Sequence, residues 1–358
     1  MKRVIGMEMH ELLQKDPELW DLFCRKEEYH SSVRDKENRF PFYASSYRYI
    51  FEPKASEYLM KNGYQVEYPE GKPFAVCLTH DIDRIYESPA SKMSDATKKL
   101  MHGKCAASCQ SFQQLRSKKI PLVNFEDIMK LEERYNARSS FYFLALEPGD
   151  RDFTYTIKDL EHELGTILEG GWEVGLHAGH QGSCDLSKLL KEKRNLEKIT
   201  NTTISGCRNH YLKFIVPDTW ELLSNAGFLY DCSFGYADCA GFRNGMCHPF
   251  RPFNLTKGKP VDIIEIPLVI MDDSLFDTYM RLDQERAWEI TRGLIDTVAT
   301  YHGVITLLWH NYSFIGEQRT FYEKILNYCA EKDAWMTGGE QISRWWKKNV
   351  KIGSQDTH

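Results

Sequence analysis

Short apolar runs alternate with amphipathic runs along most of this chain, and this alternation limits its fold more than any other feature. The apolar runs have the length and composition of strands, and the amphipathic runs have the length of helices. The predicted strands are residues 74–83, 139–146, 172–176, 204–207, 227–230, 261–268 and 304–309. The predicted helices are residues 125–135, 159–169, 186–199, 217–226, 285–302 and 321–332. Such alternation predicts a parallel sheet with crossover helices, and about seven repeats favour a barrel-like closed sheet over an open one.

The composition agrees with a large folded core and argues against two classes of protein. The 358 residues are 42% hydrophobic, which suits one elaborated domain or two smaller ones. A formal net charge of -5 argues against a protein that binds nucleic acid by electrostatic attraction. No apolar run approaches the length of a membrane span. The N-terminal residues become charged before an apolar signal-peptide segment can form, so we expect a cytoplasmic protein.

The chain divides into two predicted parts. Residues 1–70 form an N-terminal element to which the sequence assigns no role, and residues 71–350 form the barrel. Glycines and prolines between residues 63 and 73 mark the boundary. A polar stretch rich in serine and lysine, at about 88–122, is interpreted as an insertion in the barrel.

Two carboxylates end the strand predicted at residues 74–83. Asp81 and Asp83 are two positions apart and lie at the carboxyl end of this strand, where α/β folds gather ligand and catalytic residues. Two carboxylates so close together repel each other unless their roles differ. A metal ion bound by one, while the other accepts a proton, would divide the roles. Two solvated acids in a turn are the alternative that this pair alone leaves open.

Further predicted strands also end in residues that can carry chemistry. These residues are His177 and His180 after one strand, Arg208, His210 and Tyr211 after the next, and His310 after the strand at 304–309. The repeated placement of such residues at strand ends favours an active site over an isolated turn.

Five short motifs along the chain occur in a characteristic order. They are Thr79-His-Asp-Ile-Asp83, Glu173-Val-Gly-Leu-His177, Gly206-Cys-Arg-Asn-His-Tyr211, Gly227-Phe-Leu-Tyr-Asp-Cys-Ser233 and Leu307-Leu-Trp-His310. As a set they resemble the motifs of the polysaccharide deacetylases of the NodB-homology type, carbohydrate esterase family 4 in the broad sense. The resemblance extends over residues 72–345 and is strongest to the branch found in bacterial surface-polysaccharide gene clusters. It implies an α/β fold, a distorted (β/α) barrel, and a metal-dependent deacetylase.

The resemblance implies a set of metal ligands and one departure from the family. Asp83 and His177 match positions that bind the metal. The family's other ligand lies four residues after the first histidine, a position that is Gln181 in this chain. The resemblance therefore leaves two candidates for the missing ligand, His180 and His210.

The resemblance also implies the residues that act on the substrate. Asp81 would be the general base, and Arg208 would hold and orient it. The backbone amide of Tyr211 would lie near the oxyanion, and Asp231 would line the substrate groove. His310 would be the general acid.

These observations lead to a specific expectation. We expect a divalent metal, in the first place Zn²⁺, with Ni²⁺, Co²⁺ or Fe²⁺ as alternatives, because histidine and carboxylate ligands suit all four. The expected reaction is hydrolysis of the N-acetyl group of an amino sugar in a surface polysaccharide or its precursor. The expected partner is an acetylated amino sugar or oligosaccharide, and the oligomeric state is not predicted.

Alternatives to this reading remain open from the sequence alone. One is a catalytically inactive glycan-binding protein of the same fold, and another is a metal-dependent hydrolase of another amide or ester. Two further acids, Asp272 and Asp273, follow a predicted strand, and the sequence favours a solvated turn for them.

Overall fold

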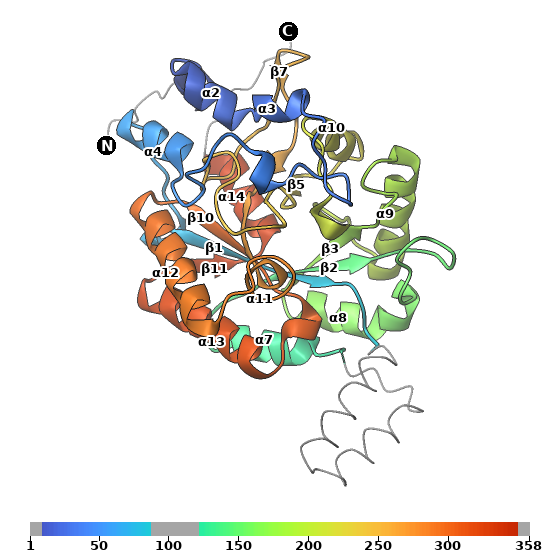
Figure 1. The fold of residues 1–358 in the computed structure, drawn as a ribbon. Helices are drawn as coiled ribbons and strands as arrows, with labels where there is room; N and C mark the ends of the chain where they lie inside the picture. Colours follow the sequence, from blue (N-terminus) through green and yellow to red (C-terminus); the bar gives the residue numbers. More distant parts are fainter. Residues whose placement is uncertain (1–8, 87–121, 350–358) are drawn as a thin grey trace.

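The computed structural model describes residues 9–86 and 122–349 (Figure 1). One large sheet lies at the centre of the molecule, and helices surround it. The insertion predicted at about 88–122 lies outside the described residues, except for its last position. No helix in the described ranges combines the length and the hydropathy that crossing a membrane requires.

Within the described residues the central sheet contains nine strands, and every pairing between them is parallel. Their order is β8-β5-β4-β3-β2-β1-β10-β9, and β11 pairs with β1 off this path. The strands are β1 (Ala75–Ile82), β2 (Ser140–Leu144), β3 (Glu173–Ala178), β4 (Gly206–Asn209), β5 (Tyr230–Asp231), β8 (Ile264–Glu265), β9 (Leu268–Met271), β10 (Val304–Leu308) and β11 (Trp335–Thr337). A separate antiparallel hairpin joins β6 (Phe253–Asn254) to β7 (Lys259–Pro260).

The sheet curls because its two terminal strands are neighbours in the sequence. β8 pairs with β5 at one end of the strand order, and β9 pairs with β10 at the other. Only residues 266 and 267 separate β8 from β9, so the two ends of the sheet must lie close together. The predicted distorted (β/α) barrel is therefore confirmed.

The prediction of about seven strands was too low. The single strand expected at 261–268 is two short strands on opposite ends of the sheet, and Pro267 stands between them. Proline has no backbone N–H to donate to a ladder, so a continuous strand is disfavoured at this position. β11 adds a further strand beside β1.

Residues of β1 alternate between two buried layers. Val76 and Leu78 belong to the large core under the surrounding helices, whereas Ala75 and Cys77 belong to a second core inside the barrel. All eight residues of the strand are buried, as expected when both faces of a parallel sheet are covered.

Two helices of the barrel, α9 and α12, begin at a side-chain cap, and both bury one face. Asp185 caps α9 by accepting a hydrogen bond from the Lys188 N–H at 3.0 Å, and Asp283 caps α12 through the Arg286 N–H at 2.9 Å. These helices are α7 (Phe125–Glu133), α8 (Glu161–Glu169), α9 (Leu186–Thr200), α10 (Asp218–Asn225), α11 (Asp272–Phe276), α12 (Gln284–Thr300), α13 (Gly316–Glu331) and α14 (Gly339–Asn349). Short 3-10 turns lie at Phe42–Ala44, Pro69–Gly71, Ile157–Leu160, His210–Leu212 and Asn311–Ser313.

The N-terminal segment packs onto the barrel and shares its core. It contains α1 (Met9–Leu13), α2 (Pro17–Phe23), α3 (Lys26–Tyr29) and α4 (Lys54–Lys61), drawn in blue in Figure 1. Leu13, Phe23 and Leu59 are buried in the same apolar cluster as the strands. The division into residues 1–70 and 71–350 remains a prediction about domains.

A buried ion cluster joins the two parts. Glu28 of α3 accepts from Arg25 Nε at 2.8 Å and from Arg243 Nη2 at 2.6 Å, and all three side chains are only 1% exposed. Arg25 also donates to the Arg243 carbonyl oxygen at 2.8 Å. The two guanidinium groups therefore share the Glu28 carboxylate, and Arg25 also pairs with Glu27 at 2.5 Å.

Replacing Glu28 tests how much its carboxylate stabilises the fold. We expect Glu28→Gln to lower the free energy of unfolding by about 3–5 kcal/mol, because two buried cations would lose their common counter-charge. Urea denaturation followed by circular dichroism measures the change. The matched control is Asp21→Asn, whose partner Lys26 is 57% exposed, and it should leave the midpoint nearly unchanged. Equal midpoints for the two variants would contradict this account of the cluster.

Candidate active site

The carboxyl ends of the central strands bring the predicted site residues together. Asp81 lies on β1 at the same inward-facing parity as Ala75 and Cys77. His177 pairs in register with Arg208 across β3 and β4. Because parallel strands end at one rim of the barrel, residues far apart in the sequence face one small volume there.

Three side chains at this rim form a group suited to a metal ion. Asp83, His177 and His210 each place one ligand atom within 4.8 Å of the others. The Nε2 atoms of His177 and His210 lie 3.1 Å and 3.7 Å from Asp83 Oδ1. Nδ1 of His177 bonds the Arg208 carbonyl oxygen at 3.0 Å, so it carries a proton. In a neutral ring with its proton on Nδ1, the lone pair is on Nε2, and Nε2 is the atom that faces Asp83.

The protonation states of Asp83 and His210 fit metal binding. Burial alone would raise the pKa of Asp83, but the neighbouring His210, His177 and His310 hold it below its usual range. Burial lowers the pKa of His210 to about 4, so its ring is neutral at neutral pH. One carboxylate and two imidazoles are donors that zinc and the later first-row divalent ions accept. The residues present therefore fit a divalent cation.

His180, the other candidate for the missing ligand, lies outside this group. Its Nε2 accepts a hydrogen bond from Arg151 and lies 3.3 Å from Lys213 Nζ. Partial burial and these two cations lower the pKa of His180. The structure brings His210 rather than His180 to Asp83, and the ligand assignment itself stays a prediction.

Asp81 and Arg208 lie beside the ligand group as a buried pair of opposite charge. Arg208 Nη1 is 3.6 Å from Asp81 Oδ1, and Arg208 Nη2 donates to Thr79 Oγ1 at 3.0 Å. Asp81 Oδ2 lies 3.7 Å from His177 Nε2. Within the described part of the chain, Asp81 Oδ1 and Arg208 Nε and Nη1 are buried without a hydrogen-bond partner. Such atoms are rare in a finished core and are typical of a site that receives a ligand.

His310 is paired with a carboxylate that the sequence analysis misjudged. Its Nδ1 donates to Asp272 Oδ1 at 2.7 Å, and its backbone N–H donates to Asp272 Oδ2 at 2.9 Å. The solvated turn expected for Asp272 and Asp273 was wrong, because Asp272 is 0% exposed and Asp273 accepts from the Tyr312 hydroxyl at 2.8 Å. The register of Leu308 with Met271 across β10 and β9 sets Asp272 beside His310.

The charges around His310 keep it protonated. Burial alone would lower its pKa, but Asp272 and Asp273 raise it well above the ordinary value. His310 Nε2 lies 3.7 Å from Asp83 Oδ2, so the proton on that nitrogen faces the ligand group. A histidine in this state can donate a proton at neutral pH.

Tyr211 lies at the rim, where its side chain contacts two site residues. Its ring stacks on the His210 ring with centroids 3.9 Å apart, and its hydroxyl donates to Asp152 Oδ1 at 3.0 Å. Asp152 Oδ2 lies 3.8 Å from His210 Nδ1. The sequence analysis missed Asp152, although its position in the loop after β2 was a usable signal.

Asp231 lies in the protein interior. It is 0% exposed, and both the hydroxyl and the backbone N–H of Ser233 donate to it, at 2.7 Å and 3.0 Å. Burial raises the pKa of Asp231. The structure thus places its carboxylate among packed residues, and the predicted contact with substrate stays a prediction.

His80, which lies between the site residues in sequence, points away from them. Its Nδ1 bonds the Trp309 carbonyl oxygen at 2.8 Å, and its Nε2 bonds Glu132 Oε1 at 2.9 Å. Because Trp309 precedes His310, these bonds hold the end of β10 against β1.

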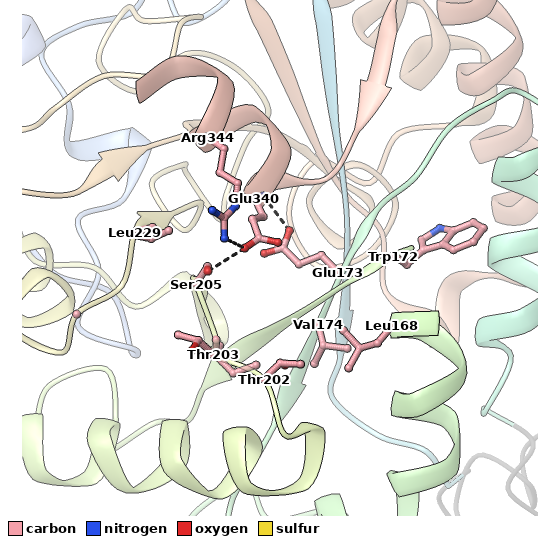
Figure 2. A pocket seen from close by; sticks show the side chains of 12 residues that line it. Leu168, Trp172, Glu173, Val174, Thr202, Thr203, Ser205, Leu229, Glu340 and Arg344 are labelled. Atoms are coloured by element: carbon pink, nitrogen blue, oxygen red, sulfur yellow. Dashed lines mark hydrogen bonds and ion pairs between the residues drawn. The ribbon is translucent and has the colours of Figure 1, made fainter. Parts of the chain in front are cut away.

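A cavity of about 540 Å³ lies at the other end of the strands (Figure 2). Figure 2 shows Glu173, Ser205 and Glu340 meeting at its wall, where the Ser205 hydroxyl donates to Glu340 Oε1 at 2.9 Å. Glu173 accepts from the Tyr230 hydroxyl at 2.6 Å and from the Glu340 N–H at 2.8 Å. These polar atoms satisfy one another, and the predicted site residues do not line this cavity.

Solved structures of other proteins share this fold. A chain from Mycobacterium smegmatis assigned as a polysaccharide deacetylase superposes with a TM-score of 0.54 at 18% identity, over 82% of this chain and 96% of that chain. A chain from Pseudomonas aeruginosa PAO1 with the same assignment gives a TM-score of 0.57 at 14% identity, over 82% and 98%. Puue allantoinase gives a TM-score of 0.54 at 15% identity, over 88% and 99%. No protein-family model and no curated relative matches the chain.

The chain has the polysaccharide-deacetylase fold. The recognition made from its motifs is confirmed at the level of the fold, while sequence identities below 20% carry no substrate with them.

The pairing of His310 with Asp272 makes a prediction about proton affinity. Asp272→Asn should lower the pKa of His310 by about 1–3 pH units, because it removes the nearest negative charge that stabilises the imidazolium. An NMR titration of the His310 ring protons measures this change. Asp296→Asn, a substitution on α12, is the control and should leave the titration unaltered. An unchanged pKa in Asp272→Asn would contradict the assigned role of this carboxylate.

Proposed function

We propose that this protein is a divalent-metal-dependent de-N-acetylase that acts on an acetylated amino sugar. One observation carries the proposal. Three residues suited to bind a metal ion, Asp83, His177 and His210, lie together, and the Asp81 carboxylate and the protonated His310 lie beside them. Amide hydrolysis needs these parts together: an activated water, a stabilised acyl oxygen and a proton for the departing amine.

The ligand group would hold the metal through Asp83 and the Nε2 atoms of His177 and His210. When bound, a divalent cation there supplies Lewis acidity and lowers the pKa of water from about 15.7 towards about 7.

Asp81 is positioned to act as the general base. It accepts a proton from water as the water oxygen forms a bond to the acyl carbon. Arg208, whose Nη1 lies 3.6 Å from Asp81 Oδ1, restricts the orientation of that carboxylate because its own Nη2 is bonded to Thr79.

His310 is positioned to complete the reaction as the general acid. The Nε2 proton passes to the nitrogen as the bond between acyl carbon and nitrogen breaks, which releases the amine and acetate. Asp272 accepts the Nδ1–H bond throughout, so it fixes the ring orientation and stabilises the imidazolium before transfer.

The resemblance in motifs and the assignment of two structural neighbours support an amino sugar of a surface polysaccharide, or its precursor, as the substrate. A second candidate is hydrolysis of a small cyclic amide, since Puue allantoinase has the same fold at a similar TM-score.

The metal ligands can be identified by elemental analysis of purified variants. We expect near-stoichiometric divalent metal in the parent and strongly reduced metal in Asp83→Ala, His177→Ala and His210→Ala. His180→Ala is the matched control and should retain metal, because its ring nitrogen faces Arg151 and Lys213.

The reverse pattern for the two histidines would assign the ligand to His180. A parent without metal, even after incubation with divalent ions, would contradict metal dependence and favour an inactive glycan-binding protein.

Activity can be measured as acetate release from a panel of acetylated amino sugars and oligosaccharides, with allantoin consumption followed in parallel. Asp81→Asn should reduce the rate by about 10²–10⁴-fold while metal content is retained, because it removes proton transfer and leaves the ligand group intact. Turnover of allantoin without acetate release would replace the first candidate by the second.

A further inference from the structure

The turn that carries His210 has an unfavourable backbone conformation. Tyr211 and Leu212, the two residues that follow His210, have φ values of 60° and 52°. Left-handed conformations are uncommon for residues other than glycine and are unfavourable for them. Two in succession persist only where surrounding contacts hold them, so the position of His210 depends on whatever holds this turn.

One contact that holds the turn comes from the N-terminal segment, beside the burial of Leu212 and the bond from the Tyr211 hydroxyl to Asp152. Arg39, which is 7% exposed, donates from Nη1 to the carbonyl oxygen of Tyr211 and from Nη2 to the Tyr279 hydroxyl at 2.8 Å. Asp35 fixes this guanidinium, since it accepts from Arg39 Nε at 2.7 Å and from the Arg39 backbone N–H at 2.9 Å. Arg39 therefore reaches the turn as a preorganised, buried side chain.

The turn passes this constraint on to the histidine ring. The stacked ring of Tyr211 covers one face of His210, and its hydroxyl holds Asp152 near His210 Nδ1. Tyr211 thus restricts one face of the His210 ring, whose Nε2 lies 3.7 Å from Asp83 Oδ1. Arg39 contacts Tyr211 and not His210, so it acts through Tyr211.

We propose that Arg39 is a positioning residue for the metal site, and that the N-terminal segment thereby completes the ligand group of the barrel. The proposal rests on the proposed function in one respect: Asp83, His177 and His210 must be metal ligands. It gives a role to a part of the chain for which the sequence indicated none. Groups that orient a ligand from behind typically change metal affinity by 10–100-fold when they are removed.

The sign of the effect separates positioning from simple electrostatics. Loss of a positive charge near a cation site would, by charge alone, strengthen cation binding. Loss of a constraint on His210 would weaken it, because the unliganded protein would populate other conformations of the turn. Weaker binding in an Arg39 variant therefore reports the constraint.

The experiment is a titration of the metal-free protein with Co²⁺, followed by the visible absorption that reports coordination. Arg39→Ala should bind Co²⁺ about 10–100-fold more weakly than the parent and show an altered spectrum. Arg48→Ala is the matched control, because Arg48 also donates to two backbone carbonyls of the same segment, at 3.3 Å and 3.1 Å. It should bind Co²⁺ as the parent does.

Two further variants cover the case in which Arg39→Ala does not fold. Arg39→Lys keeps the charge and one donor and should give an intermediate affinity. Tyr279→Phe removes only the hydroxyl that Arg39 Nη2 contacts and should weaken binding slightly. Thermal melting of each metal-free variant shows whether the fold is retained.

The outcomes separate this inference from the proposed function. A parent that binds no Co²⁺ refutes the metal site itself. A parent that binds, together with folded Arg39 variants of unchanged affinity and spectrum, overturns the positioning role alone. Weaker binding in Arg39→Ala, with partial recovery in Arg39→Lys and none lost in Arg48→Ala, supports it.

Discussion

The carboxylate of Asp83 is the group on which the arrangement of the site depends. A charged carboxylate that leaves water loses several kcal/mol of solvation, and only nearby positive or donor groups offset the loss. Here the offset comes from three histidines: His177 on β3, His210 directly after β4 and His310 shortly after β10. Those histidines reach Asp83 only if the barrel closes with the observed strand order. The arrangement that stabilises the Asp83 carboxylate therefore also brings together the side chains that could bind a metal ion.

The two acids that begin the site have different surroundings, and this difference resolves their mutual repulsion. Asp83 faces imidazoles, whereas Asp81 faces the guanidinium of Arg208. A third acid, Asp272, keeps His310 protonated from the far side. The three carboxylates thus have different nearest partners, so the proposed base, ligand and acid can lie within a few ångströms of one another.

The N-terminal segment contributes to both stability and site geometry. Its ion cluster around Glu28 joins it to the barrel, and Arg39 reaches the turn that carries a candidate ligand. The segment and the barrel therefore act as one folded unit in the described chain. Through these contacts, the geometry of the proposed site depends on packing of the N-terminal segment far from the reacting atoms.

Local patterns in the sequence determined the alternation of strands and helices and the placement of Asp81, Asp83, His177 and His310 at strand ends. These features follow from hydrophobic periodicity, which acts over a few residues. Only the tertiary structure shows that His210 rather than His180 lies beside Asp83, because the left-handed turn at Tyr211 and its contact with Arg39 are long-range effects. The local sequence could not predict the burial of Asp272 either. This burial arises because the chain crosses from β8 to β9, and β9 pairs with β10. Sequence patterns therefore identify which groups are available at a strand end, and packing determines which of them meet.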